Sequence, residues 1–133
     1  MATTRLGILL GLGIMKPILS VAVPAHNEEE RIARCVESVV VAARQAAQPV
    51  EVVVALNRCT DRTRDIAESL GARCVVEDKK CIAAVRNAAV RASTAPAVAT
   101  LDADSWMSPN TISEILAPRI LPTPRSRQDA QGM

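Results

Sequence analysis

The stretch Ala97-Val98-Ala99-Thr100-Leu101-Asp102-Ala103-Asp104 decides the fold of this chain. Residues 97–101 are small, apolar or β-branched and follow the breaker Ala95-Pro96, a pattern typical of a short strand covered on both faces. Two acids, Asp102 and Asp104, stand at its carboxyl end. Carboxylates are not placed in a core without partners, so this strand delivers two anionic groups to the rim of a sheet. Open α/β sheets bind ligands at that rim, and a carboxylate pair there suits a hard divalent cation together with a phosphate.

The composition predicts one folded, soluble domain. The 133 residues are 49% hydrophobic and 23% charged, which is enough for a core. Trp106 is the only aromatic residue, so the core is expected to consist of Val, Ala, Ile and Leu. A net charge of +2, without a basic run interleaved with aromatic residues, argues against a nucleic-acid partner.

The cysteines point away from a zinc site. None of the four is in C-x-x-C spacing, and the single histidine, His26, is distant from them in sequence. Reduced thiols in a cytoplasmic protein are the simpler interpretation. The four are Cys35, Cys59, Cys74 and Cys81.

Apolar patterns that alternate between two periods predict the order of the elements. Strands are expected at residues 18–23, 50–56, 74–77 and 97–101. Helices are expected between them, the third at residues 82–92, and after the last strand. This alternation predicts an α/β fold with right-handed crossovers and a mostly parallel sheet. Pro24 is expected to end the first strand, and Gly71 is expected to end a helix. The expected helix starts are Asn27 with Glu30, Thr60, and Ser108-Pro109.

In a parallel sheet, all loops that lead from a strand into a helix open on the same edge. That edge would gather residues 25–28, 57–61, 78–80 and 102–104. Acids for a metal, lysines for a phosphate and polar groups for hydroxyls would therefore meet at one rim.

The two ends of the chain lie outside this pattern. Residues 6–15 form an apolar run that is too short to span a bilayer. They are interpreted either as the h-region of a signal peptide or as an extension, 1–14, before a natural start at Met15. Residues 118–133 lack periodicity and are expected to be a disordered tail, which leaves 15–117 as the domain.

Four segments resemble the motifs of family 2 glycosyltransferases. They occur in the family's order and cover about residues 18–116. The resemblance implies a GT-A fold, a three-layer sandwich that is incomplete at its C-terminus. It also implies a hexosyltransferase-like transfer from a nucleotide-diphosphate sugar, with Mg or Mn held at the Asp-x-Asp motif. The segments are Val23-Pro24-Ala25-His26-Asn27-Glu28-Glu29, Asn57-Arg58-Cys59-Thr60-Asp61-Arg62-Thr63, Arg86-Asn87-Ala88-Ala89 and Leu101-Asp102-Ala103-Asp104.

The same resemblance implies roles for individual residues. Asp102 and Asp104 would hold the ribose and the metal-bridged diphosphate, with both as metal ligands. Asn57 lies in the segment that corresponds to the base-recognising loop. The nucleoside contacts would be Pro24, Ala25, His26 and Glu28, and the basic groups near the nucleotide would be Arg86, Lys80 and Lys79. Plainer interpretations stay open: His26 as a loop residue, the lysine pair as a solvated turn, and Arg86 paired with Glu77 or Asp78.

Departures from the family pattern limit the expected activity. Leu56 stands where many members have an acid that reads the base, and Ala89 replaces a frequent glycine. After Asp104 the only acids are Glu114 and Asp129, and neither matches the family's general base. The catalytic residue is therefore unknown, and the acceptor half of the fold is expected to be missing.

Two alternative functions stay open beside sugar transfer to an unknown acceptor. One is a truncated, inactive nucleotide-binding remnant. The other is a nucleotidyltransferase, which would need a Gly-rich phosphate loop after the first strand, and residues 24–27 are not one. Peripheral membrane association and self-association through the incomplete face also stay open.

Overall fold

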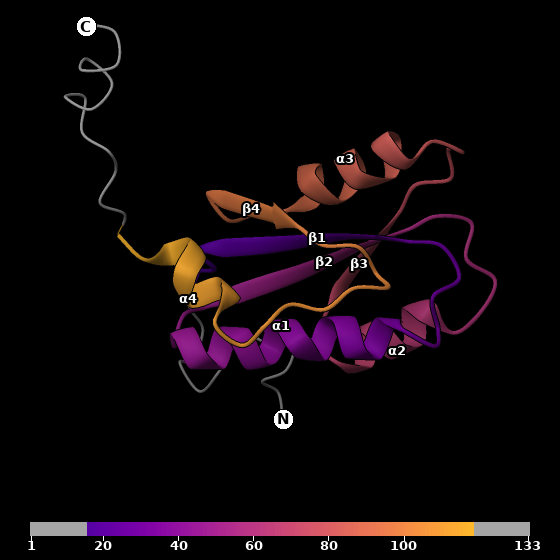
Figure 1. The fold of residues 1–133 in the computed structure, drawn as a ribbon. Helices are drawn as coiled ribbons and strands as arrows, with labels where there is room; N and C mark the ends of the chain where they lie inside the picture. Colours follow the sequence, from indigo (N-terminus) through magenta and orange to yellow (C-terminus); the bar gives the residue numbers. More distant parts are fainter. Residues whose placement is uncertain (1–15, 119–133) are drawn as a thin grey trace, which may run out of the picture.

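The fold is a three-layer α/β sandwich (Figure 1). A computed structural model describes residues 16–118, so the expectations for residues 1–14 and for the tail from residue 119 onward lie outside the described part. Helix α3 covers one face of the sheet and helices α1 and α2 the other. The elements are β1 (Leu19–Ala25), α1 (Ile32–Ala46), β2 (Val50–Leu56), α2 (Thr63–Ser69), β3 (Arg73–Val76), α3 (Ile82–Ala92), β4 (Ala97–Thr100) and α4 (Thr111–Leu116).

The four strands pair in the order β3-β2-β1-β4, and every pair is parallel. Strand β1 pairs with β2 over its whole length, from Leu19 opposite Val50 to Ala25 opposite Leu56. It pairs with β4 over a shorter span that ends at Ala22 opposite Thr100. The expected α/β class and parallel sheet are confirmed, and the bounds of β2 and α3 are those expected.

The main core lies between the sheet and α1. The buried stripe of α1 recurs every three or four residues, as an amphipathic helix requires. A smaller cluster on the other face joins Ala22, Val53 and Ala55 of the sheet to Val85 and Ala89 of α3. The buried residues of α1 are Ile32, Cys35, Val36, Val39, Ala42 and Ala43.

Strand β4 is exposed, so the expectation that it is covered on both faces was wrong. Ala97, Val98 and Thr100 are exposed, and Val98 is 38% accessible. The reason is its position: β4 is the last strand at one side of the described sheet, and α3 packs mainly over β1 and β2. A short apolar run fits an edge strand as well as a central one.

Pro24 does not end β1, which continues through Ala25. The carbonyl of Ala22 accepts a bond from the Leu101 amide, so Ala22 and every second residue after it face the β4 side. Pairing with β4 ends at Ala22. The N–H that Pro24 lacks therefore faces a side without a paired strand, which is where a sheet tolerates proline.

The expected starts of three helices were also wrong. Helix α1 begins at Ile32, helix α2 at Thr63 and helix α4 at Thr111, each a few residues beyond the expected cap. Asn27 has φ of 49°, which is a left-handed loop conformation rather than a helix cap. Gly71, with φ of 99°, follows α2 as expected.

Candidate functional site

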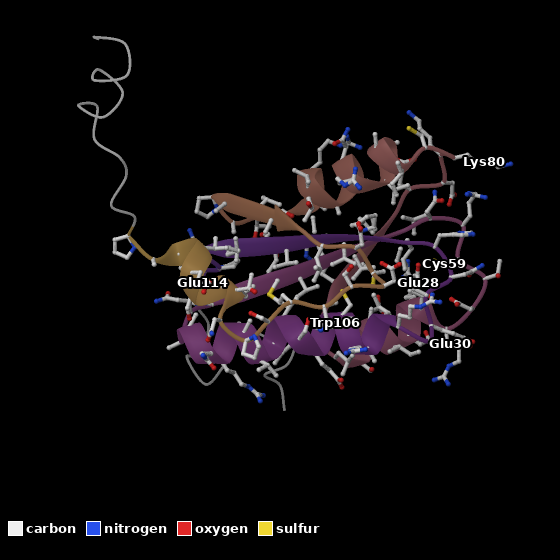
Figure 2. The ribbon with its side chains drawn as sticks, viewed as in Figure 1. Glu28, Glu30, Cys59, Lys80, Trp106 and Glu114 are labelled. Atoms are coloured by element: carbon white, nitrogen blue, oxygen red, sulfur yellow. The ribbon has the colours of Figure 1, made fainter. Side chains whose placement is uncertain are left out.

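A cleft of about 480 Å³ opens at the carboxyl end of the sheet. The loops after all four strands and the first turns of α3 line it, because parallel strands deliver these loops to one edge. Figure 2 shows Glu28 and Lys80 at this end of the molecule, whereas Glu114 lies at the opposite end. Lys79 is not among the residues that line this cleft, but the other nine residues predicted from the sequence all are: Pro24, Ala25, His26, Glu28, Asn57, Lys80, Arg86, Asp102 and Asp104.

Asn57 holds together three loops beneath the cleft. Its side-chain nitrogen donates to the carbonyls of Glu77 at 2.6 Å and Lys79 at 2.8 Å. Its backbone amide donates to the carbonyl of Ala25 at 2.8 Å. With its side-chain donors engaged in this way, Asn57 is 6% exposed and orders the loops that line the cleft.

His26 is held by the same loop. Its Nδ1 lies 2.6 Å from the carbonyl oxygen of Asn57. A carbonyl only accepts hydrogen bonds, so Nδ1 carries the proton, and Nε2 of a neutral ring is an acceptor. His26 is exposed and lines the cleft, so this acceptor is available to a ligand.

The motif residues beyond His26 join two loops to each other. Asn27 Oδ1 accepts a bond from the Thr60 amide at 2.7 Å, and the Glu28 amide donates to Thr63 Oγ1 at 2.8 Å. The Glu29 amide donates to Asp61 Oδ2 at 3.1 Å. These contacts explain why Asn27 and Thr60 do not cap helices: their polar groups are used between loops.

Asp61 is the centre of this loop network. Its carboxylate also accepts bonds from the backbone amide and the hydroxyl of Thr63. Desolvation alone would raise the pKa of Asp61, but the hydrogen bonds from Thr63 and from the Glu29 amide hold it below its ordinary value.

Asp102 and Asp104 have carboxylates without a partner among residues 16–118. Both residues are exposed, and neither side chain takes part in a hydrogen bond or salt bridge of the described chain. Between them, Ala103 is buried at 3% exposure in the main core. The buried methyl group fixes the backbone, while the flanking acids extend to the cleft.

A buried thiol lies under these acids. Cys35 Sγ donates to the carbonyl of Asp102 at 3.6 Å. Burial, and after it the carboxylates of Asp104, Asp102 and Glu28, together raise the pKa of Cys35 to about 12. Three acids therefore act on the buried Cys35 thiol.

Basic side chains line the same cleft. Arg58, Lys80 and Arg86 take part in none of the salt bridges of residues 16–118, so the pairing of Arg86 with Glu77 or Asp78 is not observed. The sequence reasoning missed Arg58, although a basic residue in the loop after β2 belongs to the same rim. Arg58 Nε donates to Asn57 Oδ1 at 3.2 Å.

The donor set fits a cation that is shared with a ligand. No group of three or more His, Cys, Asp or Glu residues that could enclose a metal occurs among residues 16–118. Two exposed carboxylates fit Mg²⁺ or Mn²⁺ when phosphate oxygens and water complete the coordination shell. Asp102 and Asp104 are the residues that would hold such an ion.

The sequence of this chain matches one protein family over most of its length. Residues 20–119 match Glycosyl transferase family 2. Validoxylamine A glucosyltransferase of Streptomyces hygroscopicus subsp. limoneus is 33% identical over 116 residues. The match includes 81% of this chain but 25% of the Streptomyces enzyme, so the chain spans about a quarter of its curated relative.

Longer proteins of known structure share the fold. Residues 1–349 of S. aureus TarS in complex with UDP superpose with a TM-score of 0.59 at 26% identity, over 76% of this chain and 31% of TarS. Glucosyl-3-phosphoglycerate synthase of Mycobacterium tuberculosis, in complex with Mn²⁺, UDP and glucosyl-3-phosphoglycerate, gives 0.61 at 22% identity. That match covers 80% of this chain and 40% of the synthase.

Proposed function

This chain belongs to glycosyl transferase family 2, and we propose that its cleft binds a nucleotide-diphosphate sugar together with Mg²⁺ or Mn²⁺. One observation carries the proposal: Asp102 and Asp104 bring unpaired carboxylates into the same cleft as Arg58, Lys80 and Arg86. A diphosphate with a divalent cation needs both charges, since the carboxylates bind the cation and the basic groups bind phosphate oxygens.

The nucleoside would lie between the loops after β1 and β2. Pro24, Ala25, His26 and Glu28 line that part of the cleft. Asn57 acts mainly by holding these loops, because its side-chain amide already donates to two backbone carbonyls. UDP in the solved relative TarS makes uridine the first nucleoside to test.

The reaction we propose is transfer of the sugar to an acceptor that remains to be identified. A bound divalent cation would act as a Lewis acid on the leaving diphosphate. Asp102 and Asp104 would orient that diphosphate, and Lys80, Arg58 and Arg86 would neutralise its remaining charge. Among the described residues, Glu114 is the only acid after Asp104. Glu114 lies at the other end of the molecule and cannot reach the cleft (Figure 2).

Location and assembly belong to the proposal as well. The four cysteines are free thiols, which supports a reducing, cytoplasmic location. The helices formed by residues 16–118 include none that is long and apolar enough to cross a bilayer. The exposed edge of β4 supports self-association of the chain.

Isothermal titration with UDP and GDP, each with and without Mn²⁺, tests donor binding. We expect metal-dependent binding that Asp104→Ala weakens by at least about tenfold. Asp65→Ala, an exposed acid on α2 outside the cleft, is the matched control and should bind as the unaltered chain does. Binding that needs no metal, or that Asp104→Ala leaves unchanged, would contradict the proposal.

Mass spectrometry with UDP- and GDP-sugars and a panel of acceptors then tests transfer. Transfer needs a base within hydrogen-bond reach of the acceptor, and positioning supplies much of the rate. Because residues 16–118 offer no such base beyond the cleft acids, we expect slow transfer or donor hydrolysis from the 133-residue chain. Donor binding without any turnover would favour the nucleotide-binding remnant instead.

A further inference from the structure

The chain's only aromatic residue lies beside the acidic pair without lining the cleft. Trp106 follows Asp104 by two residues and is 54% exposed. The guanidinium carbon of Arg34, on α1, lies 3.4 Å from the centroid of its ring. Trp106 belongs to the loop of residues 101–110, which we call the Asp loop, and Figure 2 shows it next to α1. A half-exposed tryptophan adds little to a core, so this contact calls for another explanation.

Helix α1 holds the Asp loop at further points. Ser38 Oγ accepts a bond from the Met107 amide at 3.0 Å and donates to the carbonyl of Cys35 at 2.7 Å. Gln45 Nε2 donates to Asn110 Oδ1 at 2.6 Å. Together with Cys35 and Asp102, these contacts run along α1 from residue 34 to residue 45, on the side that faces the loop.

The acids themselves are not held by their side chains. Neither the Asp102 nor the Asp104 carboxylate has a partner among the described residues, so the backbone of the Asp loop alone determines where they lie. Ala103 fixes one point of that backbone through burial. The contacts of Trp106 and Met107 fix the segment directly after it.

We propose that Arg34, Ser38 and Trp106 are positioning residues, which hold the Asp loop so that Asp102 and Asp104 meet the cation and the diphosphate. This inference rests on the proposed function for its ligand. Its mechanism is preorganisation: a loop already held in its binding geometry loses less conformational freedom when the ligand binds. The guanidinium–ring contact and the Ser38 hydrogen bond hold the loop from outside the cleft and leave the acids free.

We call the contacts of Arg34 with Trp106 and of Ser38 with Met107 the clamp. Amide hydrogen exchange of the full chain without ligand tests whether the clamp holds the Asp loop. We expect Arg34→Ala and Ser38→Ala each to raise exchange of the Met107 and Ser105 amides about fivefold, the effect of losing one modest contact. Arg34→Lys keeps a cation over the ring and should exchange nearly as the unaltered chain does. Arg44→Ala, an exposed arginine in the last turn of α1, is the matched control. Unchanged exchange in both Arg34→Ala and Ser38→Ala would overturn the clamp.

Titration with UDP and Mn²⁺ tests what the clamp does for the ligand. Trp106 is the only fluorophore of its kind in the chain, so its emission reports on the Asp loop alone. We expect paramagnetic Mn²⁺ with UDP to quench it, and Arg34→Ala to weaken binding about threefold, with recovery in Arg34→Lys. Equal affinity in Arg34→Ala, Ser38→Ala and the unaltered chain would overturn the positioning role. A chain that binds no UDP at all would overturn the proposed function, and the exchange measurement would still decide whether α1 holds the loop.

Discussion

The two sides of the cleft use similar polar residues for different purposes. On the side of β1 and β2, Asn27, Asp61 and Thr63 form hydrogen bonds with each other's loops. On the side of β4, the carboxylates of Asp102 and Asp104 make no hydrogen bond or salt bridge within the described chain, and the strand before them lies exposed at the sheet edge. The comparison teaches that a motif contains both residues that build the site and residues left free to bind.

The largest effect is expected on the β1–β2 side. Thr63 is fully buried, and its hydroxyl joins the Glu28 amide to the Asp61 carboxylate. Thr63→Val should lower the free energy of unfolding by about 3 kcal/mol, because it leaves the part-buried Glu28 amide without its acceptor and removes the hydroxyl bond to Asp61, which then keeps only backbone donors. Urea denaturation measures this change. The control Thr100→Val, on exposed β4, should change stability by less than about 0.5 kcal/mol, and equal losses in both variants would erase the difference between the two sides.

Ala103 is the point at which the β4 side does depend on packing. The residue is 3% exposed, in the main core, between two free acids. Ala103→Leu should cost about 2 kcal/mol through overpacking, and it should displace both carboxylates. Denaturation gives the first effect, and Mn²⁺-dependent UDP binding gives the second. A variant that loses stability but binds UDP normally would show that the acids do not depend on this anchor.

The pH dependence of the unfolding free energy should depend on Asp61, an acid on the β1–β2 side of the cleft. The folded pKa of Asp61 lies below its ordinary value of 3.8, so the carboxylate stabilises the fold fully above that value. This contribution is lost as the pH falls through the folded pKa, because protonation removes the acceptor for Thr63 and Glu29. Asp61→Asn should therefore weaken the dependence of the unfolding free energy on pH below about 4.

One other acid, Glu51, also makes the unfolding free energy depend on pH, so Asp61→Asn cannot remove that dependence completely. Glu51 lies in β2 and accepts bonds from Ser20 and Thr94. Burial alone would raise the pKa of Glu51, but these bonds and Arg73 hold it below its ordinary value of 4.5. Stability from Glu51 is also present above that value and lost in acid, so some pH dependence should remain in Asp61→Asn. An unchanged curve would contradict the role given to Asp61.

The smallest effect on stability is expected at the exposed edge. Val98 of β4 is 38% accessible, so Val98→Lys should change the unfolding free energy by less than about 0.5 kcal/mol. A lysine on an edge strand discourages pairing between chains, so self-association should fall. Sedimentation at several concentrations measures it. Association that is equal in Val98→Lys and in the unaltered chain would place the contact elsewhere.

The sequence by itself determined the order of the elements and most of the polar residues of the cleft, although not Arg58. Helical and alternating periods are local properties, so α3 and β2 could be bounded from the residues alone. Parallel strands must deliver their following loops to one edge, and this explains why Asp102, Asn57 and His26 were found at one rim.

Only the tertiary structure decided how those residues are used. Whether Asn27 caps a helix or accepts a bond from Thr60 depends on a loop 33 residues away. The exposure of β4 depends on how many strands lie beside it, and the contact of Arg34 with Trp106 depends on how α1 packs. Hydrogen bonding and burial are properties of neighbours in space, and residues far apart in the chain become neighbours only when the fold forms.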